Sequence, residues 1–106
     1  MELIETSIFT RQITALLSDD EYGTLQSSLA ANPGLGALIK GGGGIRKIRV
    51  PASGRGKRGG ARIIYYWAVR KEVILLLYAY AKNATSDLSP QQTARLSRLV
   101  KEEFGS

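Results

Sequence analysis

The sequence contains neither cysteine nor histidine. Without cysteine the chain has no disulfide framework and no thiolate nucleophile. Without histidine it lacks the commonest general base and the commonest metal ligand. Acid–base chemistry in this chain would therefore fall to lysine, arginine or tyrosine.

Long apolar runs and a secretion signal are also missing. The longest apolar run, from Val73 to Ala81, is too short to span a bilayer. The N-terminus carries Glu2 and Glu5 where a secretion signal would have positive charge followed by an apolar core. We therefore expect a cytoplasmic protein with no membrane partner.

Acidic residues are absent from residues 40–71, a stretch that holds ten of the fifteen lysines and arginines in the chain. We call this stretch the basic segment. The net charge of +6 favours a polyanionic partner such as nucleic acid, a ribosome or an acidic protein. Because the positive charge is concentrated in one region, the sequence predicts a surface that meets phosphate groups.

The length and composition predict a single domain over residues 1–106. The chain is long enough for one modest core, and its 43% hydrophobic and 23% charged residues are ordinary for a globular protein. Apolar periodicity and capping signals predict one strand, two helices, three antiparallel strands and a final helix. The expected elements are a strand at 2–6, helices at 8–17 and from 19 to about 31, strands at 46–50, 62–68 and 73–80, and a helix from 90. The predicted fold class is α+β, an N-terminal helical hairpin packed on a small, mainly antiparallel twisted sheet with a C-terminal helix.

Several motifs carry a family resemblance. They are the strand x-K-I-R-V, the loop and strand G-x-G-K-R-G-G-x-R-I-I-Y-Y, and the later Y-A-K-N and K-N-x-x-S-D-L. Together they make the chain resemble the RelE/ParE toxin superfamily, and the HigB-type branch in particular. The resemblance covers nearly the whole chain and implies a RelE-like fold.

The resemblance also implies a function. It suggests a bacterial type II toxin that enters the ribosomal A site and cleaves messenger RNA. The implied partners are the ribosome, messenger RNA and a cognate HigA-type antitoxin that holds the toxin inactive, with the toxin alone expected to be a monomer.

Cations in the basic segment suit RNA cleavage, which needs a base for the 2′-hydroxyl, charge stabilisation on the phosphate and an acid for the leaving oxygen. Lys47 and Arg49 project from the same face of one predicted strand, and Arg62 begins the next. Crowding among cations disfavours the charged form of a lysine, so Lys47 is the candidate base, while arginines stay charged and stabilise a phosphate. Two plain alternatives remain, a solvated strand face for the first two residues and an acid partner for Arg62.

By resemblance, Lys47, Arg49 and Arg62 match the family's basic catalytic set, and Lys82 matches a basic position after the last strand. The chain departs from the RelE pattern where Asn83 replaces an expected arginine and where residues 86–89 contain no tyrosine to stack on a base. These departures leave the general acid open. The candidate RNA or ribosome contacts are Arg46, Arg55, Lys57, Arg58, Tyr66, Tyr80 and Asn83.

No metal and no cofactor are expected. Asp19, Asp20 and Glu21 are consecutive at a helix start, so their carboxylates would diverge and could not hold an ion. Two other functions remain open. One is a non-catalytic, ParE-like gyrase inhibitor, although that branch generally lacks such a basic set. The other is a plain RNA- or ribosome-binding module, for which the RGG-like loop is the main support.

Overall fold

The computed structural model describes residues 1–51, 60–82 and 87–105. Within these ranges no helix is long and apolar enough to cross a membrane. The elements are β1 (Glu2–Glu5), α1 (Ser7–Leu16), α2 (Asp19–Ala31), β2 (Ala37–Leu38), β3 (Ile45–Val50), β4 (Ala61–Ala68), a 3₁₀ turn (Val69–Lys71), β5 (Val73–Ala81) and α3 (Pro90–Phe104). The predicted order of elements is confirmed, and the two-residue β2 is an addition to it.

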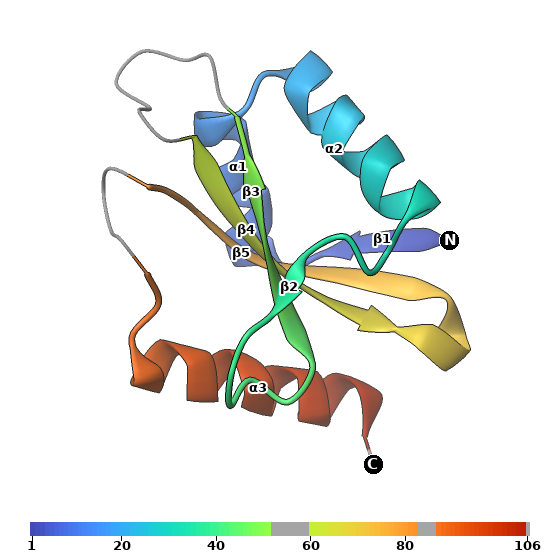
Figure 1. The fold of residues 1–106 in the computed structure, drawn as a ribbon, viewed down its shortest axis with the longest axis vertical. Helices are drawn as coiled ribbons and strands as arrows, with labels where there is room; N and C mark the ends of the chain where they lie inside the picture. The colour runs from blue at the N-terminus through green and yellow to red at the C-terminus, as the bar shows by residue number, and fades with distance from the viewer. Residues whose placement is uncertain (52–59, 83–86, 106) are drawn as a thin grey trace.

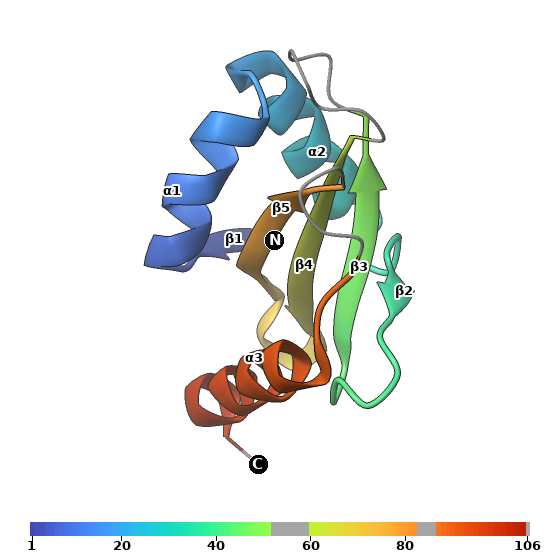
Figure 2. The same ribbon diagram turned by 90° about the vertical axis from the view of Figure 1, so that its left-hand side faces the viewer.

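The described strands form one sheet in the order β1-β5-β4-β3-β2 (Figure 1). β1 pairs in parallel with β5, and every other pairing is antiparallel. The short strands β1 and β2 lie at the two edges, as the turned view also shows (Figure 2). The predicted α+β class with a mainly antiparallel sheet is therefore confirmed.

Capping boxes are present at the starts of α2 and α3, where the sequence has its capping signals. At the start of α2, Ser18 accepts a hydrogen bond from the backbone N–H of Glu21, whose side chain accepts one from the Ser18 N–H. At the start of α3, Ser89 and Gln92 make the same reciprocal pair. These bonds satisfy N–H groups that a helix start otherwise leaves without partners, so the local sequence fixes where both helices begin.

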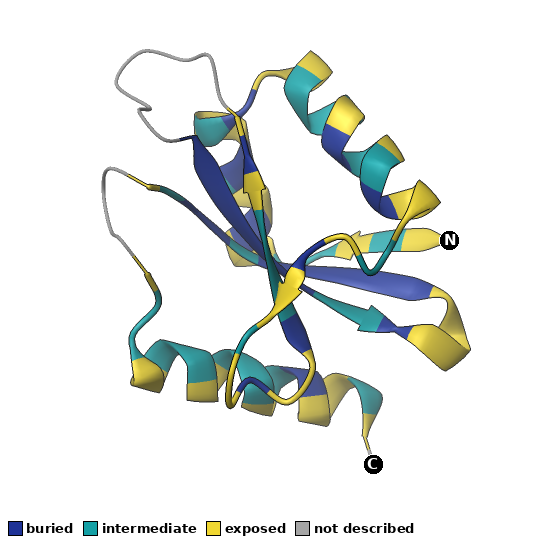
Figure 3. Cartoon of the chain, in the orientation of Figure 1, coloured by how far each residue is buried: buried dark blue, intermediate teal, exposed yellow. Residues whose placement is uncertain are grey.

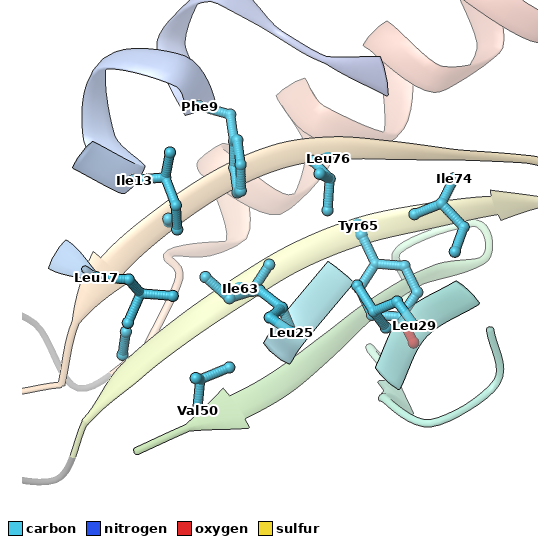
Figure 4. Packing of buried hydrophobic residues seen from close by; sticks show 12 residues of the cluster. Phe9, Ile13, Leu17, Leu25, Leu29, Val50, Ile63, Tyr65, Ile74 and Leu76 are labelled. Carbon is cyan, nitrogen blue, oxygen red and sulfur yellow. The ribbon is translucent and has the colours of Figure 1, made fainter. Parts of the chain in front are cut away.

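Helices cover both faces of the sheet. α1 and α2 lie on one face and α3 on the other (Figure 1). Both faces of β4 and β5 are consequently buried along most of their length (Figure 3). On the α1–α2 face the core includes Phe9, Ile13, Leu25, Leu29, Ile63, Tyr65 and Leu76 (Figure 4). On the α3 face it includes Ile45, Ile64, Leu75, Leu77, Tyr80 and Val100.

The connection from α2 to β3 is held by one buried tyrosine. The Tyr65 hydroxyl accepts a hydrogen bond from the Gly36 N–H and donates one to the Pro33 carbonyl, each at 2.8 Å. Arg46 adds hydrogen bonds to the carbonyls of Gly34 and Gly36 at 3.3 and 2.7 Å. These contacts hold β2 against β3, although β2 is too short to have a periodic signal in the sequence.

Candidate active site

Three side chains from three adjacent strands form a row across the sheet. Arg49 on β3 pairs directly with Arg62 on β4, and Arg62 pairs directly with Tyr80 on β5. Directly opposed residues point to the same face, with Cβ atoms about 4.5–5.5 Å apart. Lys47 lies two residues before Arg49 and so shares that face. The sheet therefore places Lys47, Arg49 and Arg62 on one face, and their catalytic roles stay a prediction.

This row lies on the α3 face of the sheet. Ile45 precedes Lys47 by two residues, Ile64 follows Arg62 by two, and both belong to the core that α3 covers. Arg49 is exposed, whereas Arg62 keeps only 9% of its surface exposed. Like charges directly opposite each other on a sheet are destabilising. The pairing therefore places two cations side by side on this face.

An irregularity in β5 places Tyr80 in the row. The pairing of β5 with β4 passes from Leu76 to Tyr78 and skips Leu77. Leu77 and Tyr78 consequently both contact the α3-side core, and the alternation of side chains is shifted from there on. With strict alternation from Ile74, Tyr80 would point to the α1–α2 face. The bulge therefore moves Tyr80 to the face that carries the cations.

Tyr80 is a buried phenol beside this cationic group. Only 7% of the residue is exposed, and its hydroxyl has no hydrogen-bond partner among the residues that the structure describes. Burial raises the pKa of Tyr80, the charge of Asp87 raises it further, and the charge of Arg62 opposes both. A buried polar atom without a partner is costly. The hydroxyl is therefore a candidate to contact substrate.

Asp87 is a site residue that the sequence reasoning missed. Its Oδ1 lies 3.2 Å from the Lys47 Nζ and accepts a hydrogen bond from the Leu88 N–H at 2.9 Å. These two contacts, the Leu88 N–H first, hold the pKa of the Asp87 carboxyl below its ordinary value, and the charge of Arg62 lowers it further. Asp87 stands in the K-N-x-x-S-D-L motif, so the motif contained the signal. Because forty residues separate Asp87 from Lys47, the sequence did not indicate that the two side chains are in contact.

Lys82 is exposed at the end of β5, two residues beyond Tyr80. Its backbone N–H donates to the Gly60 carbonyl at 3.0 Å, which ties this point to the start of β4. Lys82 therefore lies at the end of the sheet where the row is found. Its role as an acid stays a prediction.

Two of the predicted RNA contacts lie away from the row. Arg46 bonds the α2–β2 connection and lies beside Tyr65 on the α1–α2 face. Tyr66 is four residues from Arg62 along β4, about 13 Å in a strand, and its ring packs 5.5 Å from that of Phe104. Both side chains have packing roles, and contact with RNA stays a prediction for them. The other predicted contacts, Arg55, Lys57, Arg58 and Asn83, lie outside the described residues.

Known proteins share this architecture. The toxin RelE of E. coli, in the free state as a mutant with two arginines replaced by alanine, aligns with a TM-score of 0.62. The alignment has 16% identity and covers 89% of this chain and 94% of that chain. The intact E. coli RelBE toxin–antitoxin complex contains a chain that aligns with a TM-score of 0.57 and 16% identity, over 74% of this chain and 92% of that one. At this low sequence identity, the structural similarity shows a shared fold and no more.

Evidence for the family comes from the sequence itself. The sequence model for the RelE toxin of the RelE/RelB toxin–antitoxin system matches residues 7–105. That match includes every helix and every strand except β1. The chain therefore belongs to the RelE toxin family, the toxin side of a toxin–antitoxin system.

Proposed function

We propose that this toxin is a ribosome-dependent endoribonuclease that cleaves messenger RNA and so inhibits translation. Membership of the RelE family supports a ribonuclease. The observation that carries the proposal is the row of Arg49, Arg62 and Tyr80 with Lys47 on the same face. Four groups able to bind phosphate or move a proton thus gather on one patch of a rigid sheet.

The proposed reaction is attack of the RNA 2′-hydroxyl on the adjacent phosphorus, without a metal. The 2′-oxygen forms a bond to phosphorus as its proton leaves, and the bond from phosphorus to the 5′-oxygen breaks as that oxygen takes up a proton. The products are a 2′,3′-cyclic phosphate and a 5′-hydroxyl. Arg49 and Arg62 would stabilise the extra negative charge of the pentavalent phosphorus. Because Arg62 is buried, its charge acts with less screening by solvent.

Proton transfer is assigned to three groups. Lys47 is the candidate base, and its side chain must first leave Asp87 to reach the RNA. Lys82 is one candidate acid. Tyr80 is the other, because a phenol with a raised pKa stays neutral and can donate its proton. If Lys82 is the acid, Lys82→Ala should lower the cleavage rate more than Tyr80→Phe, and the reverse order would assign the role to Tyr80.

Primer extension on messages translated in a purified system tests the proposal. The wild-type toxin should cut messages within codons. Arg62→Ala should lower the cleavage rate on the order of 10²–10³-fold, as expected when a group that stabilises the transition state is removed. Arg70→Ala is the matched control, because Arg70 is exposed in the 3₁₀ turn and its loss changes the net charge equally. The double variant Lys47→Ala, Arg62→Ala should not cut.

Two results would contradict the nuclease proposal. One is equal cutting by the wild type and by the double variant. The other is intact message in the presence of the wild type. Intact message together with loss of DNA supercoiling by gyrase would indicate the ParE-like alternative.

The proposed partner is a cognate antitoxin of the HigA type, which would make this toxin a member of the HigB-type branch. The K-N-x-x-S-D-L motif and the basic segment support that branch. An acidic segment or helix laid over this surface would neutralise its charge and block RNA. Coexpression with candidate antitoxins and copurification at low and high salt would identify the partner.

A further inference from the structure

An acidic side chain already lies among the cations of the candidate active site. We propose that the Asp87 carboxylate stands in for a substrate phosphate beside Lys47 in the free toxin, and that RNA binds by displacing it. This inference deepens the proposed nuclease function and rests on it. It makes Asp87 a positioning residue that controls when Lys47 becomes available.

The donors that hold this carboxylate are the kind that hold a phosphate. Asp87 Oδ1 shares the Lys47 ammonium at 3.2 Å and the backbone N–H of Leu88 at 2.9 Å. Ammonium groups and backbone N–H groups are common ligands of nucleic-acid phosphates. A phosphate oxygen in the same place would therefore find both donors already oriented.

The other members of the site act on the same carboxylate. The charge of Arg62 interacts with Asp87, and Asp87 in turn interacts with Tyr80. The charge of this one carboxylate therefore interacts with three candidate catalytic residues, Lys47, Arg62 and Tyr80. A phosphate bound in place of this carboxylate would interact with the same three residues.

Displacement of Asp87 requires no repacking of the core. The Lys47 and Asp87 side chains are 33% and 64% exposed, so water reaches both. Exposed ion pairs contribute little to stability and open easily. Both residues also line a cavity of about 580 Å³ whose walls include Leu38, Lys40 and Pro90. The carboxylate can turn within this cavity while a phosphate takes its place.

The pairing has a consequence for the chemistry. While Asp87 is bound, the Lys47 ammonium contacts this carboxylate and not the RNA. Once a phosphate arrives, the carboxylate leaves and Lys47 lies next to the reacting RNA. The free toxin therefore holds its candidate base in an inactive pairing.

Asp87→Asn tests this inference directly. Asparagine has the shape of aspartate, and its Oδ1 can still accept the Leu88 N–H, so the backbone just before α3 keeps this contact. Glu103→Gln is the matched control, because Glu103 is exposed on α3 and its neutralisation changes the net charge equally. The probe is a short fluorescent RNA with every 2′-hydroxyl methylated, which cannot be cleaved. Its affinity is measured by anisotropy at about 0.15 M salt, where charges separated by more than about 8 Å are largely screened.

We expect Asp87→Asn to bind the probe about two- to fivefold more tightly than the wild type, the upper part of the range for an exposed charge pair. Glu103→Gln should change the affinity by less than about twofold, because salt screens a distant charge. In a Lys47→Ala background the gain from Asp87→Asn should disappear, since no ammonium is left to compete for. Circular dichroism of each variant confirms that it is folded.

Three results would overturn the inference: unchanged affinity of Asp87→Asn, an equal gain with Glu103→Gln, or a gain that survives in Lys47→Ala. Two further outcomes distinguish failure of the nuclease proposal from failure of this inference. A wild type that leaves translated messages intact while Asp87→Asn still binds the probe more tightly would reject cleavage and keep the displaced carboxylate. A wild type that cuts messages while Asp87→Asn binds normally would reject only the displacement.

Discussion

Replacing Arg49 with glutamine is expected to make this protein more stable and less active. Arg49 and Arg62 are directly opposed on adjacent strands, so their positive charges repel. Pairs of like charge at such positions cost about 0.2–1 kcal/mol. Removing one charge should therefore raise the free energy of unfolding by that amount, which corresponds to an increase in Tm of up to ~4 °C for a domain of this size.

Urea unfolding at low and high salt measures this effect. At about 20 mM salt the stabilisation by Arg49→Gln should be largest, and at 1 M salt it should almost vanish, because the screening length falls to about 3 Å. Arg70→Gln removes a charge from the exposed 3₁₀ turn and is the control for overall repulsion. Cleavage of translated message by Arg49→Gln should meanwhile fall on the order of 10²-fold.

Two outcomes would refute this reasoning. If Arg49→Gln were no more stable than Arg70→Gln at low salt, the two paired arginines would not repel each other. If its extra stability persisted at 1 M salt, the cause would be packing or strand propensity and not charge.

Other parts of the fold give further predictions. Tyr65→Phe should lower the free energy of unfolding by about 1–3 kcal/mol, because it leaves a buried N–H and a carbonyl without their partner; urea unfolding measures it. Tyr22 is partly buried and donates its hydroxyl proton to Glu5, so its pKa is raised above the ordinary 10.0. Stability from this group is complete below pH 10 and is lost as the pH rises further, so the wild type should lose stability at alkaline pH more steeply than Tyr22→Phe. Gly60→Ala should cost about 1–3 kcal/mol, because Gly60 has φ +74° and a Cβ there would lie 2.2 Å from the Val50 carbonyl oxygen.

Each of these predictions has a result that would contradict it. Wild-type stability of Tyr65→Phe would mean that the two backbone groups find other partners. Parallel alkaline profiles for Tyr22→Phe and the wild type would show that the phenol does not control the loss. An unchanged Tm for Gly60→Ala would mean that the backbone at this position is free to move.

Local signals in the sequence predicted most of the fold. The capping boxes at Ser18 and Ser89 fix the starts of two helices through contacts within four residues. Alternation in β3 placed Lys47 and Arg49 on one face, and the antiparallel hairpin brought Arg62 beside them. These features depend on neighbours in the sequence or on one short connection, which is why the residues alone could indicate them.

Features that depend on distant contacts escaped sequence reasoning. Nothing local to β5 shows that Leu77 is skipped, because a bulge exists only in relation to the partner strand. The place of Tyr80 in the row was invisible for the same reason. Asp87 contacts Lys47 although forty residues separate them in the sequence. Arg46 bonds to carbonyls of the α2–β2 connection, and the path of that connection cannot be predicted from apolar periodicity.

The place of β5 in the sheet bears on how a cell survives making this protein. β5 is the last strand to be synthesised, yet it inserts between β4 and the N-terminal β1. A nascent chain that has not yet reached Tyr80 has an incomplete row, and β1 has no strand to pair with. On the proposed function, the ribosome that translates the toxin is safe from its unfinished product. On this proposal, the toxin can cleave messages only between the docking of β5 and the binding of the antitoxin.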